Sequence, residues 1–424
     1  MAGEKLETVA VVEQKEESPK IKSVADFLDF IKKELKPRGN IATPFNIISL
    51  PIMLIGYVFI VWRLVTGLGR PITNLSQEYP WGLWIGFDVV TGVAFAGGAY
   101  VLCFIVYVLR IEKYHPIIRA TVLNGFLAYC FYAGAIVLDI GRWWNIYNPM
   151  VGNNFGVNSV MFLVAWHFFL YMMAELVEFS PAIAEWLGAK KLRKILSGLT
   201  IGAVVFGITL STLHQSGLGA LMMMAKSKIH PLWYTQFIPI LYFVSSIFAG
   251  LSLVIFEGSI SHKVFSHQID EHHHKKYDEI LVGLARICSV VMFGYFFLKI
   301  LLVVHEHAVK YVNSTMGFWW LLEMIGFILI PCFIFMRGAQ RKDKGLIKLA
   351  AVLTIMGIIL NRLNYTFIAY NWYVPLTERY WPSPVELVIT ASIILTEIWV
   401  FRWMVNRMPV LKEPPAWAKA MDQH

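Results

Sequence analysis

The sequence predicts an all-α integral membrane protein that crosses the bilayer about ten times. Of its 424 residues, 57% are hydrophobic, far more than in an ordinary soluble domain. The apolar residues gather in runs close to the ~20 residues that a helix needs to cross hydrocarbon. The 15 tryptophans and 18 tyrosines suffice for aromatic belts at two membrane surfaces. Basic residues flank the runs instead of forming one face, so the pattern favours membrane lipid and no nucleic acid as a partner.

Residues 1–43 are expected to form a cytoplasmic arm. The first 20 residues are charged and poor in aromatics, which is typical of disordered chain. From Ser23 to Leu35 apolar residues recur at helical spacing, and Ser23 with Asp26 is suited to cap this helix. Such an amphipathic helix fits either an anionic lipid surface or a partner subunit, and the sequence leaves both alternatives open. No cleavable signal precedes the first span, so we expect that span to remain as an anchor.

Ten transmembrane helices are predicted within a domain of residues 44–407, which a cytoplasmic tail of residues 408–424 follows. Short connections favour a compact arrangement of two four-helix bundles with two flanking helices. The expected spans are residues 45–66, 83–109, 117–140, 158–179, 194–212, 235–257, 279–304, 316–336, 347–370 and 383–406.

The distribution of lysine and arginine predicts the orientation of the chain. With ten spans both termini share a side, and that side carries many basic residues, among them Arg110, Lys190 and Arg341. The opposite side carries few. Cytoplasmic loops are the basic ones, so both termini are expected in the cytoplasm. The helix ends near Trp81 and Asp139 are then expected to face the periplasm.

A helical hairpin of residues 81–144 carries the first candidate site. Carboxylates within hydrocarbon are costly and are by default functional candidates. A quinone ring needs flat apolar walls and groups that donate hydrogen bonds and protons, and histidine supplies both. Alternatively, the members are an ion pair, interface anchors and a helix cap. The candidate quinone-binding residues are Trp81, Trp84, Asp88, Asp139, Arg142, His214, Gln215 and Ser216.

A second set of ionisable residues predicts a proton path. His167, Glu175 and Glu178 fall on the fourth helix, and Glu257 lies near the end of the sixth. Buried ionisable groups along one bundle are able to form such a path. The alternative is that Glu178 and Glu257 are helix-end residues hydrated by headgroup water.

The second half carries its own charges within apolar spans. Unpaired charges there are costly, so we expect Lys299 or Arg362 to pair with Glu323 or Glu397. A second conduction route is the alternative.

No metal site is expected. The four cysteines lie in apolar spans without a CxxC or CxxCH spacing, which argues against haem c, an iron–sulfur cluster or zinc. The histidine tract at 272–274 is expected to lie in a solvated cytoplasmic loop.

Several short runs together resemble one known family. They include PWGLWI at residues 80–85 with Asp88, YHP at 114–116, DIGR at 139–142, HQS at 214–216, HPLW at 230–233 and IFEGS at 255–259. In this order they resemble the NrfD/PsrC-like membrane subunits of bacterial respiratory complexes. The resemblance is closest to the ten-helix branch that includes the hydrogenase-2 "cytochrome b" subunit. The charged arm and the 262–276 segment have no counterpart in that pattern.

The resemblance implies a haem-free, quinone-interacting subunit of the bacterial inner membrane. It implies a periplasmic ferredoxin-like 4Fe–4S partner, linked to a hydrogenase or to multihaem cytochrome c subunits, and menaquinone or ubiquinone as the carrier. Among the matched residues, His214, Asp139 and Asp88 are expected to be catalytic. Glu178 and Glu257 are expected to belong to a proton path toward the cytoplasm.

Two other classes of protein remain as alternatives. A b-type cytochrome subunit needs axial histidines that face each other across helices. An ion-coupled transporter needs helices broken by glycine or proline, and the stretch from Gly92 to Gly98 is the candidate.

Overall fold

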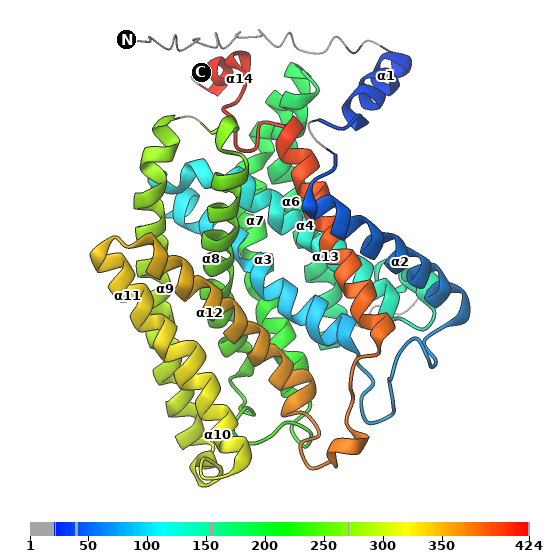
Figure 1. The fold of residues 1–424 in the computed structure, drawn as a ribbon, viewed down its shortest axis with the longest axis vertical. Coiled ribbons are helices and arrows are strands. Elements are labelled where there is room, and N and C mark those ends of the chain that lie inside the picture. Colours follow the sequence, from blue (N-terminus) through cyan, green and yellow to red (C-terminus); the bar gives the residue numbers. More distant parts are fainter. Residues whose placement is uncertain (1–20, 22, 39–40, 153–155, 270, 423–424) are drawn as a thin grey trace, which may run out of the picture.

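The computed structural model describes residues 21, 23–38, 41–152, 156–269 and 271–422. Ten helical spans of suitable length and hydropathy run through the described chain, which confirms the predicted number. The short helices α1 (Val24–Leu35) and α14 (Ala416–Asp422) lie at the same end of the molecule (Figure 1). We call this end the terminal side and the opposite end the far side. The predicted disorder of residues 1–20 lies outside the described residues.

Most spans begin within about four residues of the predicted positions, but the fourth, fifth and sixth end later than predicted, at Trp186, Met223 and Val264. Most are single α-helices, and three contain π-helical segments. The label η marks both these π-helical segments and the short 3-10 helices of the connections. In chain order the spans are α2 (Pro44–Thr66), η1–α3–η2 (Trp84–Val89, Val90–Cys103, Phe104–Val108), α4 (His115–Asp139), α6 (Val160–Trp186), α7 (Lys190–Met223), α8 (Ile238–Val264), α9 (Glu271–His305), α10–η7–α11 (Thr315–Leu321, Leu322–Leu329, Ile330–Arg341), α12–η8 (Lys344–Leu363, Asn364–Ile368) and α13 (Pro384–Arg407).

Short elements connect the spans. On the far side these are η4 (Trp143–Asn145), α5 (Asn148–Val151), η6 (Ala308–Tyr311) and η9 (Leu376–Glu378). On the terminal side they are η3 (Glu112–Tyr114) and η5 (Ser266–Gln268). The described chain contains no β-strand, and one isolated β-bridge joins Ile229 to Tyr370.

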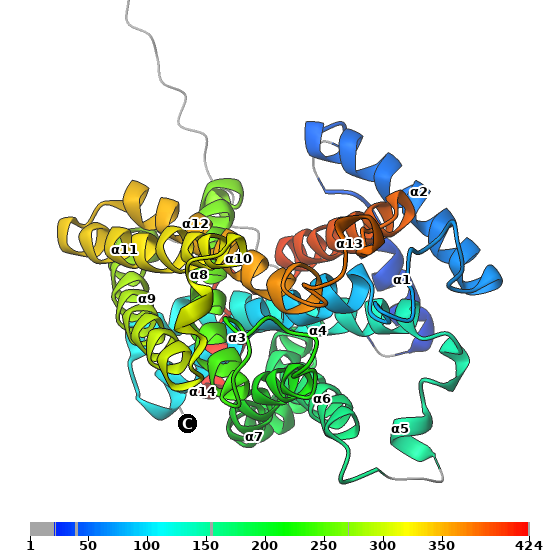
Figure 2. The ribbon, with the colours of Figure 1, turned by 90° about the horizontal axis from the view of Figure 1, so that it is seen from below.

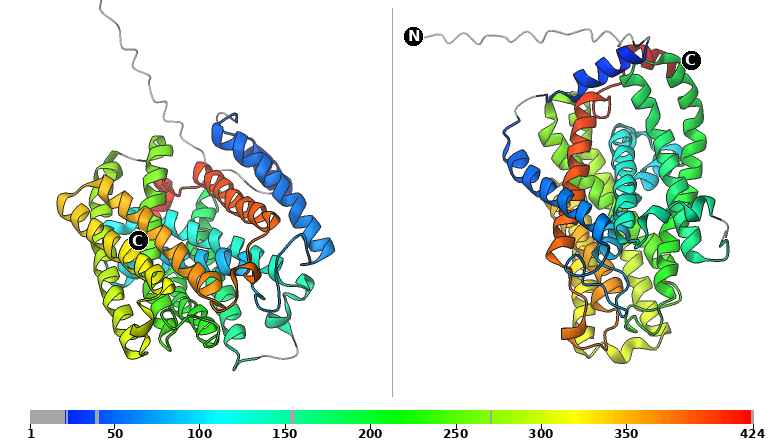
Figure 3. Two further views of the ribbon diagram at one scale, coloured as in Figure 1. Left: turned by 60° about the horizontal axis from the view of Figure 1, so that its bottom comes forward. Right: turned by 90° about the vertical axis from the view of Figure 1, so that its right-hand side faces the viewer.

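The packing of the spans follows their order in the chain. Spans α3, α4, α6 and α7 pack on one another, as do α8, α9, α11 and α12. Helices α2 and α13 pair at one edge of the molecule (Figures 2 and 3). Helix α8 also packs against α3 and α7, so the two groups share a broad interface. The division into two separate bundles therefore stays a prediction.

Glycines permit the closest approach between the two groups. A Cβ atom on Gly250 of α8 would lie 2.0 Å from the backbone nitrogen of Gly98 in α3. Small residues at such crossings let helix backbones touch within a membrane. Helix α3 runs unbroken through this glycine-rich stretch, which fits close packing and not the broken helix of a transporter.

Two of the wrongly predicted boundaries, the end of the fifth span and the start of the seventh, concern residues discussed above. The fifth span continues to Met223, so His214, Gln215 and Ser216 lie inside a helix and not at its end. Gly219 in this span serves packing, since a Cβ there would lie 2.6 Å from the Cα of Pro239. The histidine tract is also not in a loop, because α9 already begins at Glu271. The side chains of residues 271–275 lie outside the described part of the structure.

The amphipathic helix α1 forms as predicted and is docked on the terminal side. Ser23 and Asp26 form a capping box at its start. At its other end, the Arg407 guanidinium of α13 donates to the carbonyls of Glu34 and Lys36 over 2.5 and 2.8 Å. Its apolar side chains Val24 and Leu28 remain exposed, which keeps both sequence alternatives open.

Candidate functional site

Asp88 is held in the π-helical turn η1 at the start of the second span. Its side chain is 4% exposed. The Thr390 hydroxyl of α13 donates to Asp88 Oδ2 over 2.8 Å, whereas Oδ1 has no hydrogen-bond partner. π-Helical turns often occur at functional sites because they shift a side chain out of helical register. Asp88 therefore presents one free, buried carboxylate oxygen.

His214 and Gln215 lie on α7, where they contact α3, α4 and α6. Both are almost completely buried. His214 Nδ1 is 3.0 Å from the Tyr129 hydroxyl, and its Nε2 has no hydrogen-bond partner. Gln215 Nε2 donates to the carbonyl of Val93 in α3 over 2.7 Å. The neighbouring Ser216 is half-buried.

Asp139 ends α4, and its electrostatic partner is Arg63, which sequence reasoning had not singled out. Arg63 is completely buried and donates to the carbonyls of Leu138 and Ile140 over 2.5 and 2.7 Å. Its charge interacts with that of Asp139. An arginine within the apolar run of residues 45–66 was the available signal, because such a residue needs a buried acceptor.

The remaining residues of the predicted far-side set are less buried. Trp84 is completely buried, with no hydrogen-bond partner for its indole nitrogen, and Trp81 is half-buried. Arg142 is exposed, and no ion pair joins it to Asp139 among the described residues. Its neighbour Trp144 is also exposed, as an interface anchor would be.

Three of the four predicted proton-path residues lie along α6, next to two tyrosines that sequence reasoning missed, whereas Glu257 lies on α8. Glu178 accepts from the Cys103 thiol over 2.8 Å, and Glu175 lies one turn away beside Tyr171. The Tyr171 ring contacts the Tyr129 ring at a centroid distance of 4.7 Å, and Tyr129 reaches His214. These contacts form a line from the terminal side to the buried histidine. His167 is close enough to His214 for their charges to interact.

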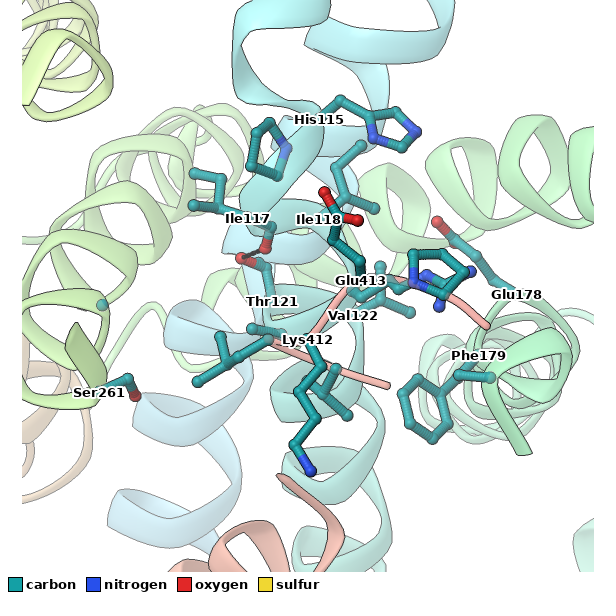
Figure 4. A pocket seen from close by; sticks show the side chains of 18 of the residues that line it. His115, Ile117, Ile118, Thr121, Val122, Glu178, Phe179, Ser261, Lys412 and Glu413 are labelled. Atoms are coloured by element: carbon teal, nitrogen blue, oxygen red, sulfur yellow. Dashed lines mark hydrogen bonds between the residues drawn. The ribbon is translucent and has the colours of Figure 1, made fainter. Parts of the chain in front are cut away.

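Two cavities are lined in part by the buried acidic residues. The terminal cavity has a volume of about 670 Å³, and Figure 4 shows side chains from separate segments around it, including Glu178, Ser261 and Lys412. The Asp88 cavity has a volume of about 690 Å³ and lies between α3, α4, α8 and α13. Its walls are mostly aromatic and aliphatic. The polar and ionisable side chains of the Asp88 cavity include Asp88, Asn124, Tyr132, Glu257, Glu397 and Arg402.

The Asp88 cavity reaches the lipid-facing surface. Ile260 of α8 and Ile398 of α13 line it and are exposed on the outside of the molecule. Phe45 and Arg402, near the terminal ends of their spans, also line it. The cavity thus extends from Asp88 toward the terminal side, and not toward the far-side cluster of Trp81 and Asp139.

The charges of the second half form a hydrogen-bonded network instead of the expected direct ion pairs. The Glu323 carboxylate accepts from Trp233 Nε1 over 2.8 Å and from the amides of Asn361 and Asn364. Asn361 in turn accepts from Arg362 over 2.7 Å. Asn361 therefore bridges Glu323 and Arg362. Asn364, three residues further along the chain, donates a second amide hydrogen bond to Glu323.

Two further members of that expectation have other neighbours. Lys299 donates to the Tyr365 hydroxyl over 3.0 Å. Glu397 lines the Asp88 cavity. Among the described residues, no cluster of three or more His, Cys, Asp or Glu side chains is arranged to hold a metal ion.

The fold and site define a multi-pass membrane protein with buried carboxylates beside an apolar cavity. Residues 71–372 match the family described as "Polysulphide reductase, NrfD". The chain belongs to this NrfD family.

Two of the relatives are described as subunits of larger complexes. The chain is 30% identical to the probable Ni/Fe-hydrogenase 2 b-type cytochrome subunit of Escherichia coli, covering 89% of this chain and 96% of that one. It is 25% identical to the integral membrane subunit of menaquinone reductase from Nitratidesulfovibrio vulgaris, covering 80% and 88%. A further N. vulgaris protein, described only as "Protein", is 41% identical and covers 90% and 98%.

Proposed function

We propose that this chain is the quinone-interacting membrane anchor of a respiratory oxidoreductase in the bacterial inner membrane. It passes electrons between a periplasmic 4Fe–4S subunit of ferredoxin type and menaquinone or ubiquinone, and holds no haem. The periplasmic subunit is linked to a hydrogenase or to multihaem cytochromes. The relatedness to a menaquinone reductase subunit and a hydrogenase subunit supports this role.

One observation carries the proposal: Asp88 offers an unpaired, buried oxygen to a largely apolar cavity. Ligand sites commonly combine apolar walls with a few polar groups in about 300–1,000 Å³, and this cavity falls within that range. A quinone exchanges two electrons and two protons when it is bound. Asp88 is placed to bond and protonate an oxygen of the ring, and the lipid-facing gap between α8 and α13 admits an isoprenoid tail.

We assign a supporting role to the far-side residues. His214, Gln215 and Trp84 are buried behind Asp88, and Asp139 holds its charge against Arg63. In this arrangement these side chains hold η1 in position and provide polar groups around it. The line from His214 through Tyr129, Tyr171, Glu175 and Glu178 is proposed as a proton path to the cytoplasm, because each member neighbours the next.

The test replaces Asp88 by asparagine in the complete complex. Binding of a short-tailed menaquinone should weaken, and quinone-linked electron transfer should fall on the order of 100-fold, the usual worth of a positioned proton-transfer group. Asp278→Asn is the matched control, since Asp278 forms an exposed ion pair with Lys344. Normal turnover in both Asp88→Asn and His214→Phe would remove the site assignment.

The b-type cytochrome alternative has one observation in its favour, the printed name of the E. coli relative. His214 is packed between Tyr129 and Phe168, with ring-centroid distances of 5.6 and 5.4 Å. A haem ligand there would need these rings to move apart. An absorption spectrum of the purified chain decides between the two, because bound haem produces an intense Soret band.

A further inference from the structure

Glu257, Ser261 and Phe401 line both cavities, and Glu257 carries the ionisable side chain among these shared residues. It lies near the terminal end of α8 and lines both the terminal cavity and the Asp88 cavity. Asn124 of α4 lies within hydrogen-bonding reach of its carboxylate. The Glu257 carboxylate therefore lies on the wall common to the terminal cavity and the Asp88 cavity.

Glu397 of α13 lies between Glu257 and Asp88. It lines the Asp88 cavity, and its charge interacts with those of both other carboxylates. Its carboxylate has no hydrogen bond or ion pair with any other described residue. The part of its surface that is exposed faces this cavity.

Among the described residues, no cation forms an ion pair with any of these three carboxylates. Arg402 also lines the cavity, but its guanidinium donates to Asn46 over 2.9 Å and lies over the Phe45 ring at 5.0 Å. The Tyr132 hydroxyl completes the polar lining on the α4 side. Carboxyl groups without a cation among them, inside an apolar wall, are suited to hold and pass protons one at a time.

We propose that Glu397 is a proton relay between Glu257 and Asp88, so that a ligand at Asp88 exchanges protons with the terminal side. The inference rests on the proposed quinone site and adds a route to it that is separate from the α6 line. When a quinone is reduced there, two electrons come from the iron–sulfur partner. Each proton that Asp88 gives up is replaced from Glu397, then from Glu257, and finally from water in the terminal cavity. Oxidation of the quinol reverses every transfer, and the three carboxyl groups end unchanged.

The geometry also separates the two routes by helix. The α6 line uses Glu178 and Glu175 and ends at His214, whereas the relay uses α8 and α13 and ends at Asp88. Both begin at the terminal cavity, which Glu178 and Glu257 line together. Because the α6 line ends at His214 and not at Asp88, it does not replace the protons that Asp88 gives up, so a substitution at Glu397 interrupts the proton supply to a ligand at Asp88.

The experiment compares Glu397→Gln, Glu397→Asp and the unmodified chain, each in the full complex reconstituted in vesicles with an internal pH dye. Glu397→Gln should bind a short-tailed menaquinone within about twofold of the unmodified chain, as measured by quenching of tryptophan fluorescence. Proton exchange with the terminal side during turnover should fall on the order of 100-fold. Glu397→Asp keeps the carboxyl group and should recover most of the rate.

A second readout does not depend on turnover. A hydrophobic carbodiimide reacts with protonated carboxyl groups in apolar surroundings, so it should label Glu397, and bound short-tailed menaquinone should protect it. Mass spectrometry of the digested chain locates the label. Absence of labelling in the unmodified protein would contradict a proton-carrying Glu397.

The control and the contradicting outcomes are distinct. Glu386→Gln removes another buried carboxylate of α13, one that caps the helix, and should lower stability without changing proton exchange per assembled complex. Normal proton exchange in Glu397→Gln overturns the relay. Loss of menaquinone binding in that variant alone also overturns it, because Glu397 would then be a ligand contact. Absence of binding in the unmodified complex instead overturns the proposed function.

Discussion

At the scale of residues, several buried charges have specific neighbours. Arg63 holds the last carbonyls of α4 and faces Asp139, while Asn361 and Asn364 satisfy Glu323. Sequence alone identified Asp139 and Glu323 as unusual, because charges inside apolar runs are conspicuous, but it missed Arg63. It could not identify their partners, since a partner depends on which helices touch and at what depth.

Replacing Arg63 by methionine should destabilise the protein by about 3 kcal/mol, because Asp139 and two carbonyls lose a buried partner. Unfolding in mixed micelles with increasing denaturing detergent measures the loss. Combining the change with Asp139→Asn should recover part of it. Equal stability of Arg63→Met and the unmodified protein would show that water or lipid satisfies these groups.

His230 should make stability depend on pH. Burial lowers the pKa of His230 to about 4, whereas an exposed histidine titrates near 6.5. The folded chain therefore keeps His230 neutral, and stability is lost as the pH falls from about 6.5 toward 4. Melting temperatures should drop across this window and drop less in His230→Asn. The exposed His267 provides the control, and an identical drop in His230→Asn would contradict the assignment.

At the scale of elements, hydrophobic runs located all ten spans. The end of the fifth span and the start of the seventh were predicted wrongly. The reason is that glycine and histidine residues suggest a helix boundary when only the sequence is known. In a membrane, glycine often marks where two helices touch. The π-helical turn that carries Asp88 and the tyrosines beside Glu175 had no signal in the hydrophobic pattern. Three of the predicted proton-path residues, His167, Glu175 and Glu178, lie along α6, whereas Glu257 lies on α8.

The contact between α3 and α8 gives a matched pair of glycine substitutions. Gly250→Ala should destabilise the protein by about 1–3 kcal/mol, since its Cβ would collide with Gly98. Gly202→Ala in α7 has open space around it and should be neutral or slightly stabilising. Unfolding in mixed micelles compares the two. Equal effects would mean that α3 and α8 are able to separate without loss.

At the scale of the whole molecule, basic residues and both described chain ends lie on one side, and the terminal cavity lies there too. This distribution supports the proposed orientation with that side in the cytoplasm. Single cysteines at Lys190 and Lys310, on opposite sides, test it with a thiol reagent that does not cross membranes. In cells with a permeable outer membrane, Lys310→Cys should react and Lys190→Cys should not. The reverse pattern would invert the topology.

The hydroxyl that bonds Asp88 comes from Thr390, 302 residues later in the chain. A ribosome must therefore finish the last span before the second span acquires its partner. Messages cut short before α13 would yield inserted chains whose acidic residue is left without its hydroxyl, and quality-control proteases could distinguish such unfinished products from complete ones.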